Sequence, residues 1–389
     1  MRWEQFNSLL AGKAQMPEPG FALGLYFAIT GDADSGRRAA EWAMGATDVR
    51  QVALVYDWCQ TNLTPAQNKA IAAKLTSALT ALAAKADFAS MRDRAFAAVV
   101  LADAQPGPSS VALRDIVLNA WKNRAIPILK GGAGLPSVEQ VQAIYELMHV
   151  VRDNLNIDLR DDFPAWFKTL PQVHLLSHYP APYPAPENEY RIPSYDADAA
   201  PDLRRAVLSR ATELSMVAYD TNAAESQFIQ GWLMQDRFLM RSPFGITYEF
   251  MWANPYQPGL SVFHLPLAVH DTGSGALFVR SSWDEDAFWL GRVGRDWQTF
   301  HDGKITVLNT QPKREPVVIG ETTLFVARDP LRFDVKQAAR AFILGLKART
   351  VYDVEVDDEE LREAVTDGAG TLEVNFAPET TTGLRLGAK

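Results

Sequence analysis

The chain has 389 residues, 47% of them hydrophobic, and a formal net charge of -9. This length exceeds the usual size of one domain, so two domains with full cores are expected. The negative charge argues against a nucleic-acid-binding protein, which would carry a basic patch and a high isoelectric point. The chain has one cysteine, Cys59, which excludes a disulfide within the chain.

The sequence predicts neither a membrane span nor a targeting segment. No apolar run is long enough to cross a bilayer, and the first residues lack the apolar core of a signal peptide. The compartment stays open. A periplasmic or secreted protein is expected if a leader was removed, and a cytoplasmic protein otherwise.

The first 240 residues have the pattern of paired helices separated by short breaks rich in Gly, Pro and Asp. Thr64 followed by Pro65 is a typical helix start, because threonine caps the first turn and proline fits the first helical position. Successive helix hairpins build a bundle, a solenoid or a closed toroid, and periodicity alone does not separate these three. Helices are expected over 21–30, 34–44, 49–59, 65–86, 88–103, 109–129, 137–154, 200–219 and 223–240.

Residues 178–195 interrupt the helices with prolines at alternate positions and several aromatic residues. Prolines exclude a regular helix and favour extended structure. A long aromatic-rich loop is either a lid or strap over a groove, or a structural crossing between helices.

After 242–245 the pattern changes to short β-type runs separated by Gly and Asp turns, as in sandwiches or barrels. The pairs Asp367-Gly368 and Ala369-Gly370 predict a hairpin turn before the last strands. Strands are expected over 276–280, 287–291, 304–308, 322–326, 341–344, 350–356 and 370–374. The sequence thus predicts a helical domain over 1–240 and a β-domain over 241–389.

Several segments carry a family resemblance in the right order. Residues 22–32 and 54–65 have the pattern of two consecutive helix hairpins, Arg280-Ser281-Ser282-Trp283 with Gly291 and Gly294 that of early β-strands, and 345–372 that of a closing small sandwich. Together they resemble the heparinase II/III and alginate lyase group of polysaccharide lyases. The resemblance implies an α+β multidomain fold, an N-terminal α/α toroid followed by an antiparallel β-sandwich.

The resemblance also implies a reaction, β-elimination at a uronic acid. A base removes the C5 proton, a neutral or cationic group stabilises the enolate-like carboxylate, and an acid, often tyrosine, protonates the leaving oxygen. Positioned proton transfer contributes roughly 10²–10⁴-fold. The family places a Tyr and an Asn or His on the toroid and a further His on the β-domain.

Two family motifs are missing from this sequence. Where the family has Glu-Gly-x-x-Tyr, residues 131–139 read Gly-Gly-Ala-Gly-Leu-Pro-Ser-Val-Glu. Where it often has a metal-holding His-x-His-x-Asp run, His301-Asp302 offers two ligands, too few for a metal site. We therefore expect no bound metal and no cofactor.

Tyr145, His149 and His301 are the catalytic candidates. Tyr145 and His149 lie one turn apart on one face of a predicted helix, which suits either acid–base work or a core pair with a hydrogen bond. His301 stands at an Asp-Gly turn, where an incidental histidine is the other reading. His174 and His178 flank the proline-rich loop and suit a groove.

A second group suits substrate binding. Aromatic residues on toroid helices are more often core than sugar-stacking surfaces. An arginine on an early strand suits a carboxylate, or else a pairing with Asp284 or Glu285. The substrate-binding candidates are Tyr56, Trp58, Tyr179, Tyr183 and Arg280.

Three functions remain open. The first is an eliminase that uses Tyr145, His149 and His301 on an acidic, uronate-containing oligosaccharide or polysaccharide. The second is a non-catalytic glycan-binding relative with eroded acid–base residues. The third is an α/α-toroid glycoside hydrolase, which needs two opposed carboxylates. Its candidate residues are Asp57, Glu146, Asp153 and Asp161.

Overall fold

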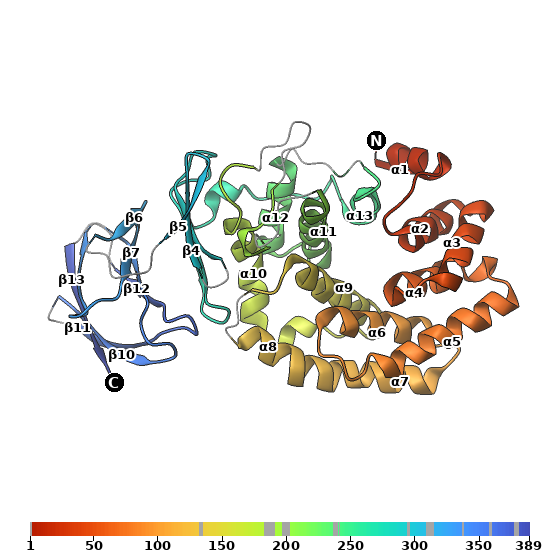
Figure 1. Ribbon diagram of the computed structural model, residues 1–389, viewed down its shortest axis with the longest axis horizontal. Coiled ribbons are helices and arrows are strands. Elements are labelled where there is room, and N and C mark those ends of the chain that lie inside the picture. The colour runs from red at the N-terminus through yellow and green to blue at the C-terminus, as the bar shows by residue number, and fades with distance from the viewer. Residues whose placement is uncertain are drawn as a thin grey trace. The chain divides into compact units, whose positions relative to one another are not determined.

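The fold is described from a computed structural model of the chain. The structure describes residues 2–131, 135–182, 191–196, 203–235, 240, 242–293, 296–308, 315–336, 338–357, 360–376 and 381–389. Contacts divide the chain into two compact units (Figure 1). The helical unit contains Met1–Pro127, Val138–Pro164 and Asp202–Pro258, and the β unit contains Ile128–Ser137, Ala165–Pro201 and Gly259–Lys389. The predicted α+β class is confirmed, with helices first and mostly antiparallel strands after them.

The helical unit contains most of the helices. None of the described helices is both long and apolar enough to span a membrane. The helices of this unit are α1 (Arg2–Ala11), α2 (Pro19–Thr30), α3 (Ala33–Gly45), α4 (Val49–Trp58), α5 (Pro65–Ala81), α6 (Phe88–Val100), α7 (Pro106–Asp115) with the π-helical turns Ile116–Ala125 after it, α9 (Val138–Leu155), α11 (Leu203–Tyr219), α12 (Ala224–Gln235) and α13 (Ile246–Trp252). Helix α8 (Ile126–Lys130) lies where the chain passes to the β unit.

Local signals explain where several of these helices begin. Asp32, Asp48 and Asp87 each accept a hydrogen bond from the backbone N–H three residues later. Thr64 does the same with Gln67, whose side chain in turn accepts from the Thr64 backbone N–H, and proline occupies the first helical position. Such caps satisfy N–H groups that the first turn leaves without partners and stabilise a helix by about 1 kcal/mol.

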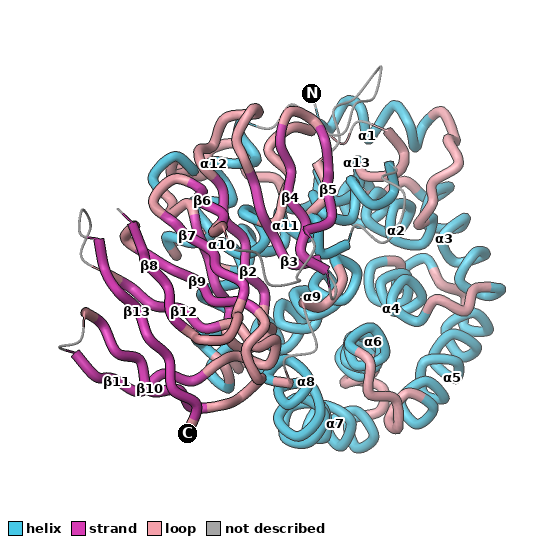
Figure 2. Tube along the Cα trace, turned by 60° about the vertical axis from the view of Figure 1, so that its left-hand side comes forward, coloured by secondary structure: helices cyan, strands magenta, loops and turns pink. Residues whose placement is uncertain are grey.

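The helices of the helical unit are neighbours in two sets. In the first set, α2 packs against α4, α4 against α6, α6 against α9, α9 against α11 and α11 against α13, and α13 packs against α1, which contacts α2. In the second set, α3, α5, α7 and α12 each pack against members of the first (Figure 2). Close packing needs Gly20 on α2, because a Cβ there would lie 2.2 Å from the ring of Trp42. The first set is therefore a succession of helices that returns to its beginning.

Among its described residues, the β unit contains three sheets and one long helix, α10 (Pro164–Leu176). The first sheet has the order β1-β2-β3-β4-β5, the second β12-β9-β7-β6 and the third β11-β10-β13-β8. The strand pairs of the described residues are antiparallel except β7 with β9, which is parallel. The strands are β1 (Ala268–Asp271), β2 (Ala276–Arg280), β3 (Trp289–Val293), β4 (Asp296–His301), β5 (Lys304–Leu308), β6 (Val317–Ile319), β7 (Thr322–Val326), β8 (Arg332–Lys336), β9 (Arg340–Leu344), β10 (Val351–Val356), β11 (Glu360–Val365), β12 (Leu372–Asn375) and β13 (Thr381–Ala388).

Alternating side chains give each sheet its two faces. On the first sheet, Leu277 and Val279 belong to a core shared with the second sheet. Phe278 and Trp289 face the other way, into a core shared with α10, where the Trp289 indole donates to the Leu176 carbonyl at 2.8 Å. The second and third sheets share a further core that includes buried residues of β7, β8, β9, β10, β12 and β13.

Two segments differ from the sequence-based expectation. Pro164–Leu176 is helical although no element was expected there, because its apolar side chains pack on the first sheet. Ile246–Trp252 is also helical, although the sequence assigned residues from 241 onward to the β-domain. The segments of the two units are consequently interleaved along the chain, and the domain ranges 1–240 and 241–389 stay a prediction. Of the loop over 178–195, residues 183–190 lie outside the described residues, and His178 pairs with Pro193 in an isolated bridge.

Candidate functional site

A cavity of about 650 Å³ lies within the helical unit and is called here the helical cavity. Residues of α2, α4, α6, α9 and α13 line it, and three of them, Tyr56, Trp58 and His149, are residues that the sequence nominated. This volume is in the range of ordinary small-ligand sites. The helical cavity is therefore the candidate site of this unit.

A buried ion network borders the helical cavity. Arg50 donates from Nε to Glu146 Oε1 at 2.8 Å and from Nη1 to Glu18 at 2.7 Å, and Arg92 donates to the second oxygen of Glu146 at 2.8 Å. The Arg50 guanidinium also lies 4.9 Å from the centre of the Phe21 ring. Burial by itself would lower the pKa of Arg50, but the neighbouring groups, Glu146 above all, outweigh it and raise that pKa. The charge of Arg50 is thus compensated within the protein.

Two half-buried tryptophans supply flat apolar surface to the helical cavity. Trp58 ends α4 and packs on Phe21, with ring centres 6.1 Å apart. Trp252 ends α13 and stacks on the His149 ring at 5.9 Å with an interplanar angle of 15°. Tyr56 also lines the cavity, but it is buried and its hydroxyl donates to Asn68 at 3.4 Å. Trp58 and Trp252 are the better stacking surfaces because part of each ring stays accessible.

The remaining charged side chains of the helical cavity are acidic. Its lining contains Asp57, Asp103, Glu146 and Asp153 against one guanidinium, Arg50. Asp57 makes no hydrogen bond or ion pair within the described part of the chain, and partial burial raises the pKa of its carboxyl. Asp153 pairs with Arg152 at 2.7 Å. The electrostatic character of the cavity is therefore negative.

His149 is a neutral imidazole with both nitrogens engaged. Its Nε2 lies 3.0 Å from the Ser215 carbonyl oxygen. Because a carbonyl only accepts, Nε2 carries the proton, and Nδ1 accepts from Arg152 at 3.4 Å. Burial lowers the pKa of His149, so the ring is uncharged at neutral pH. Proton abstraction by Nδ1 would require Arg152 to move away.

Tyr145, the predicted partner of His149, is not among the residues that line the helical cavity. It is 4% exposed, and its ring contacts Tyr219 edge-on at 6.1 Å. Burial raises the pKa of its hydroxyl well above the ordinary value, so the phenol stays protonated. Its position favours a core role, and its acid role stays a prediction.

The other nominated residues with described positions belong to the β unit. His301 ends β4 at an exposed hairpin turn, with its Nδ1 3.4 Å from Asp302. Tyr179 is buried against Trp289 and Phe300, and its hydroxyl donates to Gln298 at 2.7 Å. Tyr183 lies outside the described residues.

Arg280, the last nominated residue, is the end of β2 and is 2% exposed. Of its two sequence neighbours, Glu285 pairs instead with Arg191 at 3.4 Å. Asp284 forms no ion pair with Arg280 in the described structure. The pairing expected as an alternative is therefore not found.

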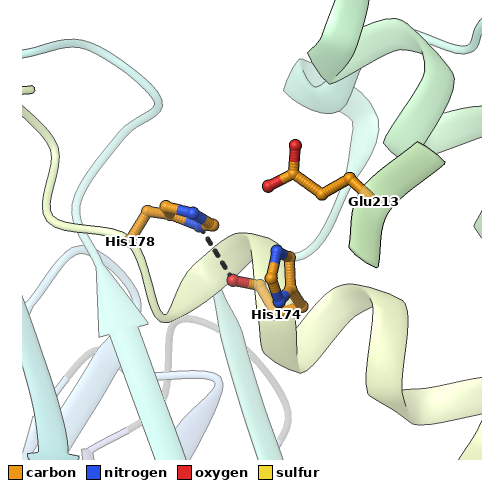
Figure 3. A group of neighbouring side chains, drawn as sticks. All are labelled: His174, His178 and Glu213. Carbon is orange, nitrogen blue, oxygen red and sulfur yellow. Dashed lines mark hydrogen bonds between the residues drawn. The ribbon is translucent and has the colours of Figure 1, made fainter. Parts of the chain in front are cut away.

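His174 and His178 lie together at the end of α10 (Figure 3). The His178 ring donates from Nδ1 to the His174 carbonyl at 2.9 Å, and the His174 ring contacts the Tyr195 hydroxyl at 2.7 Å. Burial lowers the pKa of His178 far below its ordinary value, so this ring is neutral. Glu213, also drawn in Figure 3, belongs to α11 of the helical unit, where the Ser209 hydroxyl donates to it at 3.3 Å.

Cys59 lies directly after α4 and is fully buried. Burial raises the pKa of its thiol to about 12. Because the thiolate is the reactive form, Cys59 is not a nucleophile at neutral pH.

A comparison of the chain with models of protein families finds no family that matches, and a comparison with curated proteins finds no match either. Sequence reasoning missed Arg50, Glu146 as a partner of two arginines, and Trp252. These residues come from separate helices, and no local pattern predicts that they meet.

Proposed function

We propose that this protein binds a glycan in the helical cavity and shares its architecture with the heparinase II/III-type polysaccharide lyases. In this proposal the helical unit is an α/α toroid and the β unit contains an antiparallel β-sandwich. The toroid is supported by the succession of helices from α2 to α13, which returns through α1 to α2. The sandwich is supported by the core that the second and third sheets share.

The observation that carries glycan binding is the pair of half-buried tryptophans, Trp58 and Trp252, in a cavity of ligand size. Sugar rings present flat C–H faces and a rim of hydroxyls. Indole rings pack against such faces, and the carboxylates of Asp57, Asp103 and Asp153 accept hydrogen bonds from hydroxyls. A surface that combines indole rings with carboxylates suits a carbohydrate better than a lipid or a nucleic acid.

The charge of the helical cavity favours uncharged or amino sugars at this position. Of the four lining carboxylates, Glu146 pairs with Arg50 and Arg92 and Asp153 pairs with Arg152, so Asp57 and Asp103 carry the negative charge that is uncompensated within the described structure. A polyuronate would meet repulsion there. The acidic glycan that the resemblance implies would need a cation outside the helical cavity.

Binding without elimination is the proposal that the geometry supports best. Tyr145 is buried outside the cavity lining, and His149 Nδ1, the nitrogen without a proton, accepts a hydrogen bond from Arg152. Elimination by Tyr145, His149 and His301 has less support, because these groups would have to rearrange before they could transfer protons.

The test is a calorimetric titration with neutral, amino-sugar and uronate oligosaccharides. We expect neutral or amino-sugar ligands to bind, and W58A and W252A to weaken binding by about 2- to 12-fold each, the equivalent of about 0.5–1.5 kcal/mol of aromatic contact. Y256A is the matched control, because Tyr256 belongs to the same unit, is 93% exposed and is not part of the cavity lining. Equal losses in Y256A and W58A would contradict the proposal.

Hydrolysis is a second candidate, supported by one observation. Asp57 is a cavity carboxyl with no partner among the described residues and with a pKa raised by partial burial. A general acid in a glycosidase has these properties. New reducing ends that disappear in D57N but persist in E41Q, which changes an exposed acid on α3, would establish hydrolysis. Absorbance of an unsaturated uronate, lost in Y145F, would establish elimination instead.

A further inference from the structure

Arg280 is a buried cation whose terminal nitrogens have no acceptor. Its Nε donates to the Ser282 carbonyl, and its guanidinium lies 4.3 Å from the centre of the Trp283 ring. Within the described part of the chain, Nη1 and Nη2 make neither a hydrogen bond nor an ion pair. An arginine offers five N–H donors in a planar fork, so most of the donor capacity of Arg280 is unused.

A second unused donor belongs to the same turn. The indole Nε1 of Trp283 is buried and has no hydrogen-bond partner in the described structure. An indole N–H is a donor only, so an acceptor is the one kind of group that could satisfy it. The turn from Arg280 to Trp283 thus combines a guanidinium fork and an indole N–H without a matching acceptor.

The electrostatic surroundings of Arg280 also favour a bound anion. Burial and the neighbouring Arg191 lower the pKa of Arg280 to about 9, and Asp284 offsets this only in part. The side chain consequently remains charged at neutral pH. A buried charge without a counter-ion is strongly unfavourable. Contact with the Trp283 ring offsets some of this cost but accepts no hydrogen bond.

Open space borders this end of β2. Arg280 and Ser281 line a cavity of about 580 Å³ within the β unit, whose other charged lining residues are Arg340 and Glu321 and whose lining does not include Trp283. A ligand at this position would need to be an anion with at least two acceptor atoms, because the donors are several and of one kind. A carboxylate matches a guanidinium fork with two parallel hydrogen bonds.

We propose that Arg280 and Trp283 form a carboxylate-binding site in the β unit. The Arg280 guanidinium binds both oxygens of the carboxylate from the side of the cavity, and the Trp283 ring packs on the guanidinium and reports the binding. The carboxylate belongs either to a uronate sugar or to a free organic acid. This site stands on residues of the β unit alone and does not depend on glycan binding in the helical cavity.

The test uses sodium glucuronate, glucose, sodium acetate and inorganic phosphate as separate probes. Binding is followed through the indole N–H signal of Trp283 in NMR spectra, assigned with W283F. We expect saturable shifts with glucuronate and none with glucose. A response to acetate equal to that to glucuronate identifies a general carboxylate site, and a stronger response to glucuronate identifies a uronate site.

Variants separate this site from a general charge effect. R280M should weaken glucuronate binding roughly tenfold or more, since it removes the charged hydrogen bonds. R332M is the matched control, because Arg332 is an exposed arginine of β8 in the same unit, and binding should stay unchanged. An undiminished response in R280M, or a phosphate response as strong as that to glucuronate, would overturn the carboxylate assignment.

A measurement on the unaltered protein covers the case in which R280M does not fold. Glucuronate should raise the temperature of thermal unfolding, because a ligand that binds only the folded state stabilises it by mass action. Glucose and sodium chloride at the same concentration should not. Equal effects of glucuronate and sodium chloride would overturn the proposal.

Discussion

Two buried arginines, one in each unit, differ in whether carboxylates compensate their charge. Arg50 lies over the Phe21 ring and is bound by Glu146 and Glu18, whose charges raise its pKa. Arg280 lies over the Trp283 ring without such a partner, and its pKa is lowered. The aromatic contact is common to both, so the carboxylates make the difference. A compensated cation indicates a structural role, and an uncompensated one indicates a place for an outside anion.

The largest effect is expected from removing the compensation of Arg50. The substitution E146Q leaves two arginines, Arg50 and Arg92, without their shared carboxylate. We expect the free energy of unfolding to fall by about 3–5 kcal/mol, as for a broken buried pair, measured by urea denaturation. E41Q, which breaks the exposed pair with Arg37, is the control and should have no measurable effect. A loss in E146Q no larger than in E41Q would mean that Arg50 is not compensated by Glu146.

The next largest effect on the free energy of unfolding is expected at His270, a cation of the β unit that carboxylates compensate. His270 on β1 lies 3.0 Å from Asp367 and 3.1 Å from Glu373. Burial opposes its charge, but these two carboxylates prevail and raise the pKa of His270 to about 9. Since the unfolded value is about 6.5, protonation of His270 stabilises the folded β unit fully below about pH 6.5. This contribution is lost as the pH rises through 9.

Unfolding experiments between pH 6 and 10 test this dependence. The free energy of unfolding of the β unit should fall by about 3 kcal/mol over that range, from the difference between the two pKa values. H270Q should remove the slope, and H264Q, which alters an exposed histidine of the same unit, should retain it. A slope that persists in H270Q would assign it to other groups and would leave His270 uncompensated.

The smallest effect on stability is expected at Arg280. R280M removes an unpaired charge and keeps much of the apolar contact, so the free energy of unfolding should stay unchanged or rise by up to about 1 kcal/mol. R50M should instead lower it, because Glu18 loses its cation and Glu146 keeps only Arg92. The two variants are compared by urea denaturation at one pH. A loss in R280M equal to that in R50M would show that Arg280 is compensated after all.

Local patterns predicted many of the elements because their signals are contained in a few neighbouring residues. The cap at Thr64 and the turn at Asp367-Gly368 are of this kind, and α5 and β12 begin close to the expected positions. Helix α10 was missed because Pro164 and Pro171 disfavour a helix in isolation, and packing on the first sheet outweighs that preference. Tertiary packing of this type cannot be read from a short window.

In the candidate site, too, the sequence identified single residues but not the partners that lie far away along the chain. Tyr56, Trp58 and His149 were nominated as single residues, and all three line the helical cavity. The partners that determine their chemistry, such as Arg152 for His149, follow from three-dimensional positions. Arg280 is the clearest case. Its neighbours in sequence suggested an ion pair, and yet Glu285 pairs with Arg191.

The covered state of Cys59 has a practical consequence for all these experiments. It is the one cysteine of the sequence, and its thiol is fully buried and protonated at neutral pH. Maleimide dyes react with thiolates, so they should leave Cys59 unmodified in the folded protein. A cysteine introduced at the exposed Asp286, three residues after Trp283, could carry a single fluorophore. Such a label would follow anion binding at the proposed Arg280 site while Cys59 stays in place.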